Sequence, residues 1–520
     1  MVVSVASDSF EVPWEDPADA ARTWLFDPMH FPLPMLPLGG EFLDRMYVTY
    51  MGANTIFVNG YAFSTMPTPR PPTPEIIQRG AADVWTKDYL PQIRDFCRRI
   101  RSADYESLAL PQLGAEFERI MSEAIHTFGF TMKVISGFMG PTFGLVHMLQ
   151  QALGPEGPQL AATLLQGFEN GSAAAGAGLS GLAEEAARYP AVAEALRSGR
   201  YDGLETLEGG PQFMSRLREY LDEFGWRAES WGEPERPTWA EEPRTPLMLV
   251  GRYLSDPERT PAAAIARAVA QREAATKELE SKLQGEALSQ FRQALEAAQM
   301  HVPMSEGRAL WQLIIIGSLR VPALALGRKL VEAGALSEPG DVFYFTSDEL
   351  RRAADAPGPD VLATAKSRRA DYQRWRSMTP PPFVGAPPDM SAAPPEVQAL
   401  AHLFFGAGMP EFSGREIKGQ AASRGVVRGR ARIIRTLAEG EFLQPGEVMV
   451  CKTTAPPWTP LFAIAAAVVT DTGGVLSHSA ICAREYAIPC VVATQIGTHV
   501  IPDGATVTVD GTKGIVTIEG

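Results

Sequence analysis

Hydrophobic residues recur along this chain with two different periods. Between residues 75 and 375, apolar side chains return every three or four positions among strong helix formers, as in residues 81–100, 261–299 and 317–334. Beyond residue 415 the pattern changes to short β-branched runs bounded by turn residues, which predicts strands. These runs occupy residues 425–434, 446–451, 465–471, 489–494 and 505–518, and the last one forms a hairpin around residues 510–514. The pattern predicts an α+β multidomain protein, in which a large, mainly helical domain precedes a small β/α domain.

A proline-rich stretch separates the two patterns. Residues 377–398 contain seven prolines and show neither helical nor strand periodicity. If about twenty of these residues are extended at ~3.1 Å each, the segment can reach roughly 60 Å. Charge changes at the same place, because residues 416–520 carry nine basic and nine acidic residues, so the net charge of −14 belongs entirely to residues 1–415. We therefore predict a helical domain at 1–376, a hinge at 377–415 and a small domain at 416–520, with a passive surface loop as the alternative for the hinge.

Two further segments of the helical region have individual patterns. Residues 341–350 predict a short strand followed by a helix capped at Thr346 or Ser347. Residues 30–66, within an aromatic N-terminal segment at 1–74, are rich in Phe, Tyr, Met and Pro without a clean period. This stretch is either an aromatic substrate pocket or a packed part of the core, and the sequence favours the packed core.

Composition excludes several classes of protein. A net charge of −14 argues against a general nucleic-acid-binding protein, which would present a basic face. The N-terminus lacks a basic region followed by an apolar one, so we expect no signal peptide. Apolar runs such as residues 310–317 are too short to span a bilayer, and the four cysteines suggest neither a disulfide framework nor a CxxC zinc site. The expectation is a cytoplasmic protein with no membrane or nucleic-acid partner and no metal site of its own.

The stretch TDTGGVLSHSAICAREYAIPCVV, residues 470–492, carries the clearest chemistry. A strand ends near residue 471, Thr472-Gly473-Gly474 form a tight turn, and Ser477 is a natural N-cap for the following helix. His478 then lies in the first helical turn, where free N–H groups and the positive dipole end favour an anion and a neutral imidazole. A neutral ring at an anion site suits phosphoryl capture by a ring nitrogen. Two alternatives remain: His478 is a metal ligand, or it is a structural histidine whose hydrogen bonds are satisfied and which has no chemical role.

This stretch and its surroundings closely resemble the phosphohistidine domain of the phosphoenolpyruvate-utilising enzymes. The similarity continues through SRGVVRGRARII and PGEVMVCKTTAPPWTPLF before the motif and IPDGATVTVDGTKGIVTI after it. The resemblance implies a mobile, swivelling domain in which His478 carries a phosphoryl group and Thr472 and Ser477 take part in catalysis. It also implies that Gly473 and Gly474 shape the phosphate site and that Arg484 is either a structural or a phosphate partner.

Upstream, residues 219–243 and 327–351 are similar to the helical middle domain of the same family. In rifampicin phosphotransferases the corresponding region binds the substrate, which makes residues 1–375 the expected acceptor-binding part. The sequence shows neither an ATP-grasp domain nor a phosphoenolpyruvate/pyruvate barrel, so its architecture resembles the swivel-bearing subunit of split systems such as phenylphosphate synthase. The resemblance implies that a separate ATP-grasp subunit supplies ATP and Mg²⁺, and that this chain binds no cofactor itself.

The resulting hypothesis is one subunit of a two-component, ATP-dependent phosphotransferase. The partner converts ATP to AMP and phosphate while phosphorylating His478, and the swivelling domain delivers the phosphoryl group to a small hydroxylated acceptor, which we expect to be phenolic. Candidate residues at the acceptor are His126, His147 and Glu123, although histidines in a helical core are the more ordinary interpretation. Two alternatives remain: a non-catalytic phospho-carrier, and the remnant of an antibiotic-modifying phosphotransferase.

Overall fold

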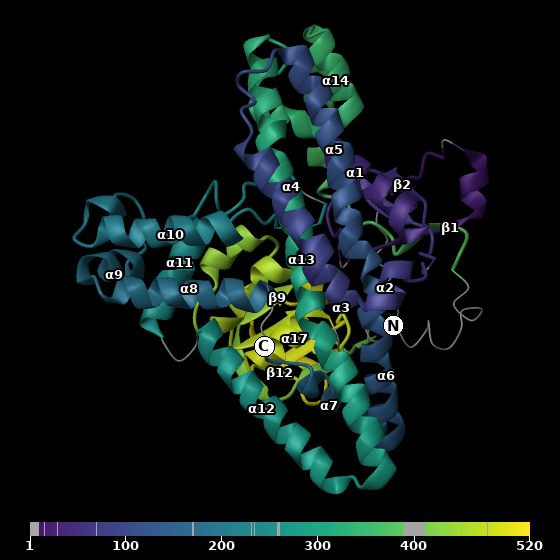
Figure 1. Cartoon of the computed structure of the whole chain (residues 1–520), viewed down its shortest axis with the longest axis vertical. Coiled ribbons are helices and arrows are strands. Elements are labelled where there is room, and N and C mark those ends of the chain that lie inside the picture. Colours follow the sequence, from purple (N-terminus) through teal and green to yellow (C-terminus); the bar gives the residue numbers. More distant parts are fainter. Residues whose placement is uncertain are drawn as a thin grey trace. The chain divides into compact units, whose positions relative to one another are not determined.

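The computed structural model describes residues 10–14, 16–28, 30–68, 70–168, 171–229, 231–232, 234–256, 260–388, 411–475 and 477–519. Two compact units interleave along the sequence (Figure 1). In their described parts, unit 1 comprises Met1–Ser136, Arg227–Pro237 and Trp311–Ala392, and unit 2 comprises Gly137–Trp226, Thr238–Leu310 and Ala393–Gly520. Helices precede a C-terminal sheet, which confirms the α+β class.

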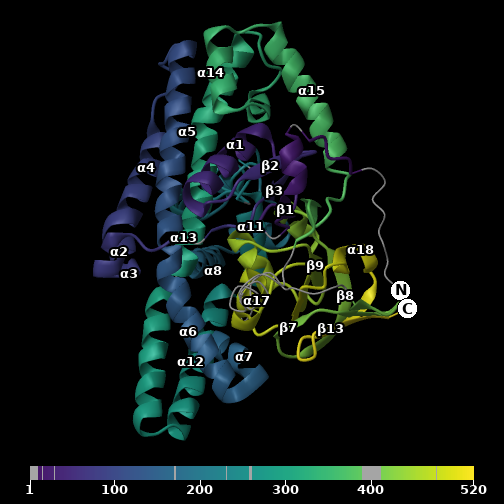
Figure 2. The ribbon, with the colours of Figure 1, turned by 90° about the vertical axis from the view of Figure 1, so that its right-hand side faces the viewer.

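Unit 1 combines helices with a small antiparallel sheet. Its strands β1 (Thr23–Phe26), β2 (Thr55–Val58), β3 (Tyr61–Ser64) and β4 (Phe383–Gly385) pair in the order β2-β3-β1-β4. The helices and turns are η1 (Pro17–Ala21), α1 (Pro37–Met46), η2 (Tyr47–Met51), α2 (Pro74–Arg79), α3 (Ala81–Val84), η3 (Trp85–Tyr89), α4 (Leu90–Ser102), α5 (Leu110–Lys133), η7 (Pro339–Tyr344), α14 (Ser347–Asp355) and α15 (Pro359–Trp375). Helices α5 and α14 lie side by side (Figure 2).

The strand predicted at residues 341–345 is wrong. Residues 339–344 form the tight helical turn η7 instead. The buried Asp341 carboxylate accepts hydrogen bonds from the backbone N–H groups of Ser337 and Glu338, both at 3.1 Å, and pairs with Arg369. These contacts, which a local pattern cannot reveal, close the turn. The predicted cap at Thr346 is confirmed, because its hydroxyl and the Glu349 side chain form a capping box.

The aromatic N-terminal segment is part of a packed core. Phe31, Met35, Phe42 and Phe63 are all buried, as are many of their apolar neighbours. The packed-core interpretation of residues 30–66 is therefore the one that the structure supports.

The beginning of the proline-rich segment is a strand. Residues 383–385 form β4, which pairs with β1 at the edge of the sheet, from Thr23 opposite Gly385 to Leu25 opposite Phe383. Flanking prolines are compatible with an edge strand. One side of such a strand has no neighbouring strand, so no backbone N–H group is needed there for hydrogen bonding. The expected absence of strand structure is thus wrong at these three residues. Residues 389–410 of the predicted hinge lie outside the described residues, so the hinge and the domain boundaries at 377–415 stay predictions.

Unit 2 contains a set of helices and the larger sheet. The helices before the sheet are α6 (Ile135–Leu153), η4 (Gly154–Glu156), α7 (Gly157–Leu164), α8 (Gly171–Ala187), α9 (Pro190–Arg197), η5 (Leu204–Thr206), α10 (Gly210–Phe224), α11 (Arg244–Ser255), α12 (Pro261–Lys282) and α13 (Gly285–Glu332). Both α6 and α13 continue into unit 1.

Nine strands form the C-terminal sheet in the order β5-β6-β13-β12-β8-β9-β10-β11-β7. They are β5 (Glu411–Phe412), β6 (Glu416–Lys418), β7 (Gln420–Ser423), β8 (Val426–Ile433), β9 (Val448–Cys451), β10 (Ala467–Thr470), β11 (Cys490–Val492), β12 (Thr506–Asp510) and β13 (Ile515–Ile518). The turns η9 (Leu437–Phe442) and η10 (Pro456–Ala463) and helices α17 (His478–Glu485) and α18 (Gly497–Val500) lie between them. Every strand run predicted beyond residue 424 is present, including the final hairpin.

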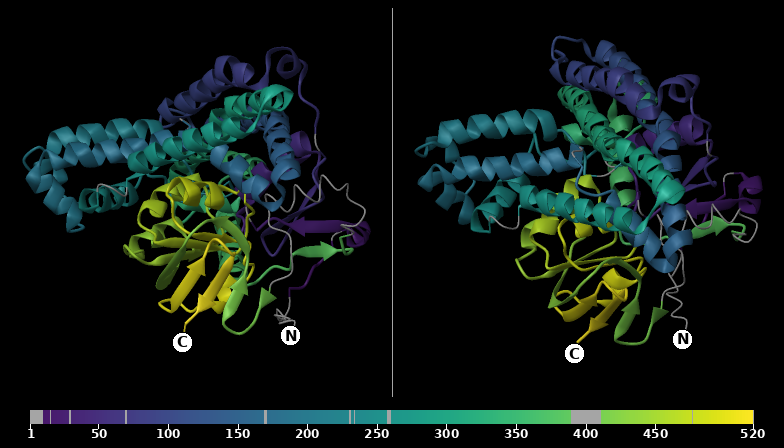
Figure 3. Two further views of the ribbon diagram at one scale, coloured as in Figure 1. Left: turned by 90° about the horizontal axis from the view of Figure 1, so that it is seen from below. Right: turned by 60° about the horizontal axis from the view of Figure 1, so that its bottom comes forward.

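The centre of this sheet is parallel and fully buried. Strands β8, β9, β10 and β11 pair in parallel, and every residue of β9, β10 and β11 is buried. Parallel strands share one carboxyl edge, where loops commonly form sites. Helix α17 follows β10 at this edge and packs against β7, β10 and β11, while α12 covers it from the other side (Figure 3). The sheet therefore fixes where α17 begins.

Helix α13 is the one described helix that is long and apolar enough to cross a membrane, by length and composition alone. Its most apolar window includes the run at 310–317, and 78% of that window is buried within the protein. A core helix of this kind meets the same criterion without a membrane.

We expect Val469→Ala in β10 to lower the free energy of unfolding of the sheet by about 2 kcal/mol, since Val469 is fully buried in the core. Hydrogen exchange of the peptides covering β9 and β10 should then accelerate roughly 30-fold. The matched control is Val426→Ala in β8, whose side chain is 61% exposed and whose replacement should change exchange little. Equal effects of the two substitutions would contradict the assigned core.

Candidate active site

The turn after β10 is built for a close backbone approach. Gly473 has a φ of +95°, and a Cβ atom there would lie 2.8 Å from the Ser477 hydroxyl oxygen. Only glycine fits such a position. The Ser477 N–H donates to the Gly474 carbonyl at 3.0 Å, and the Ser477 hydroxyl accepts from the Ala480 N–H at 3.4 Å. Ser477 thus caps α17, as its position in the sequence predicts.

The loop that follows β9 covers the beginning of α17. The Thr472 N–H and hydroxyl both donate to the Lys452 carbonyl, each at 3.0 Å. Further along the loop, the hydroxyls of Thr454 and Ser479 are hydrogen-bonded at 2.8 Å. Thr472 therefore joins the two loops, and its hydroxyl is engaged by backbone rather than by His478.

The His478 ring lies among three different side chains. Its Nε2 is 3.2 Å from the Thr459 hydroxyl oxygen and 3.4 Å from the Cys482 sulfur. Its Nδ1 is 3.9 Å from Oε2 of Glu306 on α13. The Thr459 hydroxyl also donates to the Pro456 carbonyl at 2.9 Å, which fixes the oxygen that faces the ring. Both ring nitrogens therefore have polar neighbours.

Burial keeps this ring uncharged. The side chain is 13% exposed, and desolvation lowers the pKa of His478 from 6.5 to about 4, although a hydrogen bond with the Ala455 backbone opposes the shift. At neutral pH the imidazole therefore retains a free lone pair. A neutral imidazole at the start of a helix is a competent nucleophile toward phosphorus.

A small pocket opens at the ring. Its lining comes from α8, α12, α13, η10 and the residues of and next to α17, and consists of Ala173, Gly176, Pro261, Ala264, Ile265, Glu306, Thr459, His478, Ile481, Cys482, Glu485 and Tyr486. Its cavity volume is about 20 Å³, which is room for one or two water molecules. The pocket therefore admits water as it stands, and a larger acceptor would need it to open.

Two of the lining residues are carboxylates with raised pKa values. Burial raises the pKa of Glu306, and the Arg308 guanidinium opposes this. Burial and, to a smaller extent, the nearby Glu306 charge together raise the pKa of Glu485 to about 7, against a hydrogen bond from the Gly167 N–H and the Arg484 charge. A glutamate whose pKa lies near neutrality, as that of Glu485 does, is suited to proton transfer.

Arg484 lies elsewhere on α17. Its Nη1 donates to the Ala422 carbonyl of β7 at 2.8 Å, and burial lowers the pKa of this guanidinium to about 10. Arg484 is not among the residues that line the His478 pocket. Its proposed phosphate contact has no support from this geometry.

The acceptor candidates from the sequence do not line the His478 pocket either. His126 is exposed on α5 in unit 1, with its ring edge-on to Phe130. Glu123, also in unit 1, is ion-paired with Arg99 and with Arg119. In unit 2, His147 is exposed on α6 and lies 2.8 Å from the Gln151 side chain.

Four residues at the ring were missed by the sequence analysis: Thr459, Cys482, Glu485 and Glu306. Cys482 and Glu485 follow His478 at four and seven positions, so a helical projection would have placed them on its face. Thr459 lies in the PPWTPLF segment, but nothing in that segment indicates which residue reaches the ring. Glu306 carries no local signal, because only the fold brings α13 to α17.

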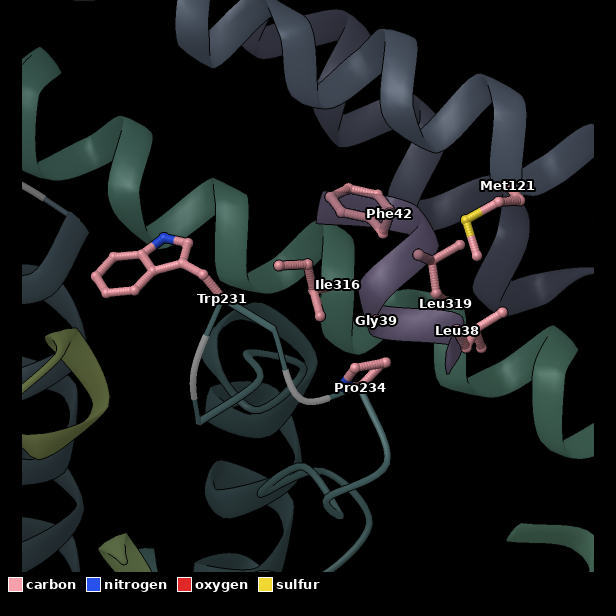
Figure 4. A pocket seen from close by; sticks show the side chains of 8 residues that line it. All are labelled: Leu38, Gly39, Phe42, Met121, Trp231, Pro234, Ile316 and Leu319. Carbon is pink, nitrogen blue, oxygen red and sulfur yellow. The ribbon is translucent and has the colours of Figure 1, made fainter. Parts of the chain in front are cut away.

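Unit 1 contains a second, purely apolar pocket. Figure 4 shows the side chains that line it, from α1, α5, α13 and the loop around residue 231: Leu38, Gly39, Phe42, Met121, Trp231, Pro234, Ile316 and Leu319. Water-sized spheres can occupy about 10 Å³ of it, too little for an organic ligand. In the part of the chain that the structure describes, no group of three or more His, Cys, Asp or Glu side chains could hold a metal ion.

Comparison with protein families supports the resemblance. Residues 443–514 match the mobile domain of PEP-utilising enzymes, and residues 129–306 match the fourth domain of rifampicin phosphotransferase. The second match covers Glu306 and the first covers His478, so both sides of the pocket lie in matched segments.

Several curated proteins are similar to this chain. A chondramide synthase of Chondromyces crocatus is 30% identical over an alignment 553 positions long. This alignment covers 98% of this chain and 14% of the synthase. An uncharacterised phosphotransferase of Bacillus subtilis is 30% identical over 61% of this chain and 37% of its own length. The rifampicin phosphotransferase of Streptomyces sviceus is 28% identical over 79% of this chain and 46% of its own. The chain thus spans less than half the length of these relatives.

The shielded environment of His478 generates a prediction about its titration. In the folded protein the ring should titrate near pH 4, and in denaturant near 6.5. Because the exposed ring takes up a proton more readily, acid should destabilise the buried state as the pH falls from about 6.5 to 4. NMR titration measures this, with the resonance assigned by its loss in His478→Asn. A folded-state pKa at or above 6.5 would contradict the assigned burial.

Proposed function

We propose that this chain, a relative of the phosphoenolpyruvate-utilising enzymes, is the phosphohistidine-bearing part of a phosphotransferase. The observation that carries the proposal is a neutral His478 at a capped helix start, facing a pocket that contains two carboxylates. A ring nitrogen with a free lone pair attacks phosphorus, and the N-phosphate is then held against a backbone that Gly473 opens to it. Covalent capture divides one difficult transfer into two displacements.

In the first displacement, the phosphoryl donor is ATP bound by a separate ATP-grasp subunit. The β-phosphoryl group passes to His478, releasing AMP and phosphate, and Mg²⁺ accompanies the nucleotide on the partner. We place this reaction in the cytoplasm, where ATP is available.

In the second displacement, the swivelling domain presents its phosphoryl group to the hydroxyl of a small acceptor. The match of residues 129–306 to the fourth domain of rifampicin phosphotransferase supports a hydroxylated acceptor on the helical side of the pocket. A phenolic acceptor remains our first choice, and rifampicin, named in the activity of the relatives, is the second. The pocket has to open to admit either one.

The test mixes the purified chain with a cognate ATP-grasp protein, Mg²⁺ and ATP labelled in the β-phosphate. Label should appear on the wild type and on the control His30→Asn, which lies in unit 1 and pairs with Asp27, and not on His478→Asn. Phenol or rifampicin should then discharge it. Label that persists on His478→Asn would refute the proposal, and label that neither acceptor discharges would favour a phospho-carrier.

A further inference from the structure

One face of α17 gathers the ionisable side chains of the pocket. His478, Cys482 and Glu485 stand at positions i, i+4 and i+7 of the helix, so they share a side. Glu306 of α13 lies opposite, with Oε2 at 3.9 Å from Nδ1 of His478. All four line the same pocket, and the 3.9 Å between Glu306 and the ring is a separation that a bridging water molecule can span for proton transfer.

Glu306 and Glu485 are electrostatically coupled. The Glu306 charge raises the pKa of Glu485, on top of the effect of burial. Arg308 on the Glu306 side and Arg484 on the Glu485 side each partly oppose the shift, and Arg267 of α12 acts on the neighbouring Tyr486. When one of two buried carboxyl groups is ionised, its negative charge opposes ionisation of the other. Near neutral pH the pair therefore holds one proton.

Glu485 accepts a hydrogen bond from the Gly167 N–H, and a close backbone contact holds Gly167 in place. Gly167 has a φ of +70°, and a Cβ atom there would lie 2.6 Å from the Val269 backbone nitrogen. Arg272 donates to the carbonyls of Gln166 and Gly167 at 3.0 and 2.8 Å, which holds this segment in place. The Gly167 N–H can therefore reach the Glu485 carboxylate.

The remaining ionisable groups of the pocket keep their charge state. Burial raises the pKa values of the Cys482 thiol and the Tyr486 hydroxyl well above their ordinary range, so both stay protonated. The dephosphorylated His478 ring stays neutral. Among the described residues, α8 and α12 contribute apolar side chains and glycine to the lining, and the charged Arg267 of α12 acts on the neighbouring Tyr486. The mobile proton of this site therefore belongs to the two glutamates.

We infer that Glu306 and Glu485 form a proton-sharing pair that serves phosphoryl transfer from His478, with Glu306 exchanging the proton with Nδ1. This inference rests on the proposed function and adds the proton path to it. Because Glu306 faces Nδ1, the phosphoryl group is carried on Nε2.

Atoms and protons balance in the transfer step. The acceptor oxygen attacks phosphorus, the Nε2–P bond breaks, and its electron pair returns to the ring. Nδ1 receives a proton from Glu306, which makes the departing imidazole neutral. The acceptor hydroxyl then passes its proton to Glu306, which has just become ionised. The pair begins and ends with one proton, and Glu485 acts as a positioning residue that keeps that proton available.

The test loads the chain with phosphoramidate, a small phosphoryl donor, and follows loss of the phosphoryl group from His478 to water and to phenol. Glu306→Gln, given enough time, should reach the same final extent of loading as the wild type, but it should discharge roughly 100-fold more slowly, the usual scale of general acid–base catalysis. Glu306→Asp should recover part of the rate. The matched control is Glu278→Gln on α12, an exposed glutamate paired with Lys282, which should discharge at the wild-type rate.

The pH profile tests the coupling of the pair and needs no Glu306 variant. Wild-type discharge should fall as the pH rises through about 7, because the pair then loses its proton. In Glu485→Gln a negative charge is removed, the pKa of Glu306 drops, and the fall should move to lower pH. A merely structural role of Glu485 would leave the position of this fall unchanged.

The outcomes separate the two proposals. If the wild type takes up no phosphoryl group on His478, the proposed function itself fails. If His478 is loaded but Glu306→Gln discharges at the wild-type rate, or the profile of Glu485→Gln matches that of the wild type, the proton-sharing pair alone is overturned.

Discussion

The shielding of one imidazole from water organises this site. His478 begins α17 at the carboxyl edge of a buried parallel sheet, where the helix dipole and the loss of solvent both penalise a positive ring. The ring remains neutral, and neutrality gives it a lone pair for phosphorus. The glycine turn, the Ser477 cap and the loop after β9 serve mainly to hold the ring in this position.

Phosphorylation reverses the electrostatic balance of the same pocket. A neutral ring gains a dianionic group beside two carboxylates, which is unfavourable unless the pocket takes up a proton or the domain moves away. The contacts between the sheet and the helices of unit 2 are compatible with such movement. Two of them are exposed: Arg252 donates to Gln444 at 3.0 Å, and Arg244 is ion-paired with Glu441. A third, the hydrogen bond from the Tyr253 hydroxyl to the Pro460 carbonyl at 3.2 Å, is buried and would have to break. Exposed polar contacts of this kind are individually weak.

The sequence contained the local part of this arrangement. Strand β10, the glycine turn and the capped helix followed from turn and capping chemistry within a dozen residues, and α17 begins where Ser477 predicts. Turn η7 was mistaken for a strand because its shape depends on the pairing of Asp341 with the distant Arg369. Glu306 was missed for the same reason: no periodicity on α13 shows that it will face a histidine from another part of the chain. The acceptor candidates on α5 and α6 were chosen for their residue types, and residue type does not report position.

The central claim is that His478, and no neighbouring nucleophile, carries the phosphoryl group. Ser477, Ser479 and Cys482 all lie within four residues of it, and a hydroxyl or thiol could compete. Tandem mass spectrometry of the peptide that spans α17, after phosphoryl loading and digestion at alkaline pH, distinguishes them directly. The account predicts one phosphoryl group on His478 that is lost in acid and retained in alkali. A group mapped to Ser477, Ser479 or Cys482, or an unmodified peptide, would contradict it.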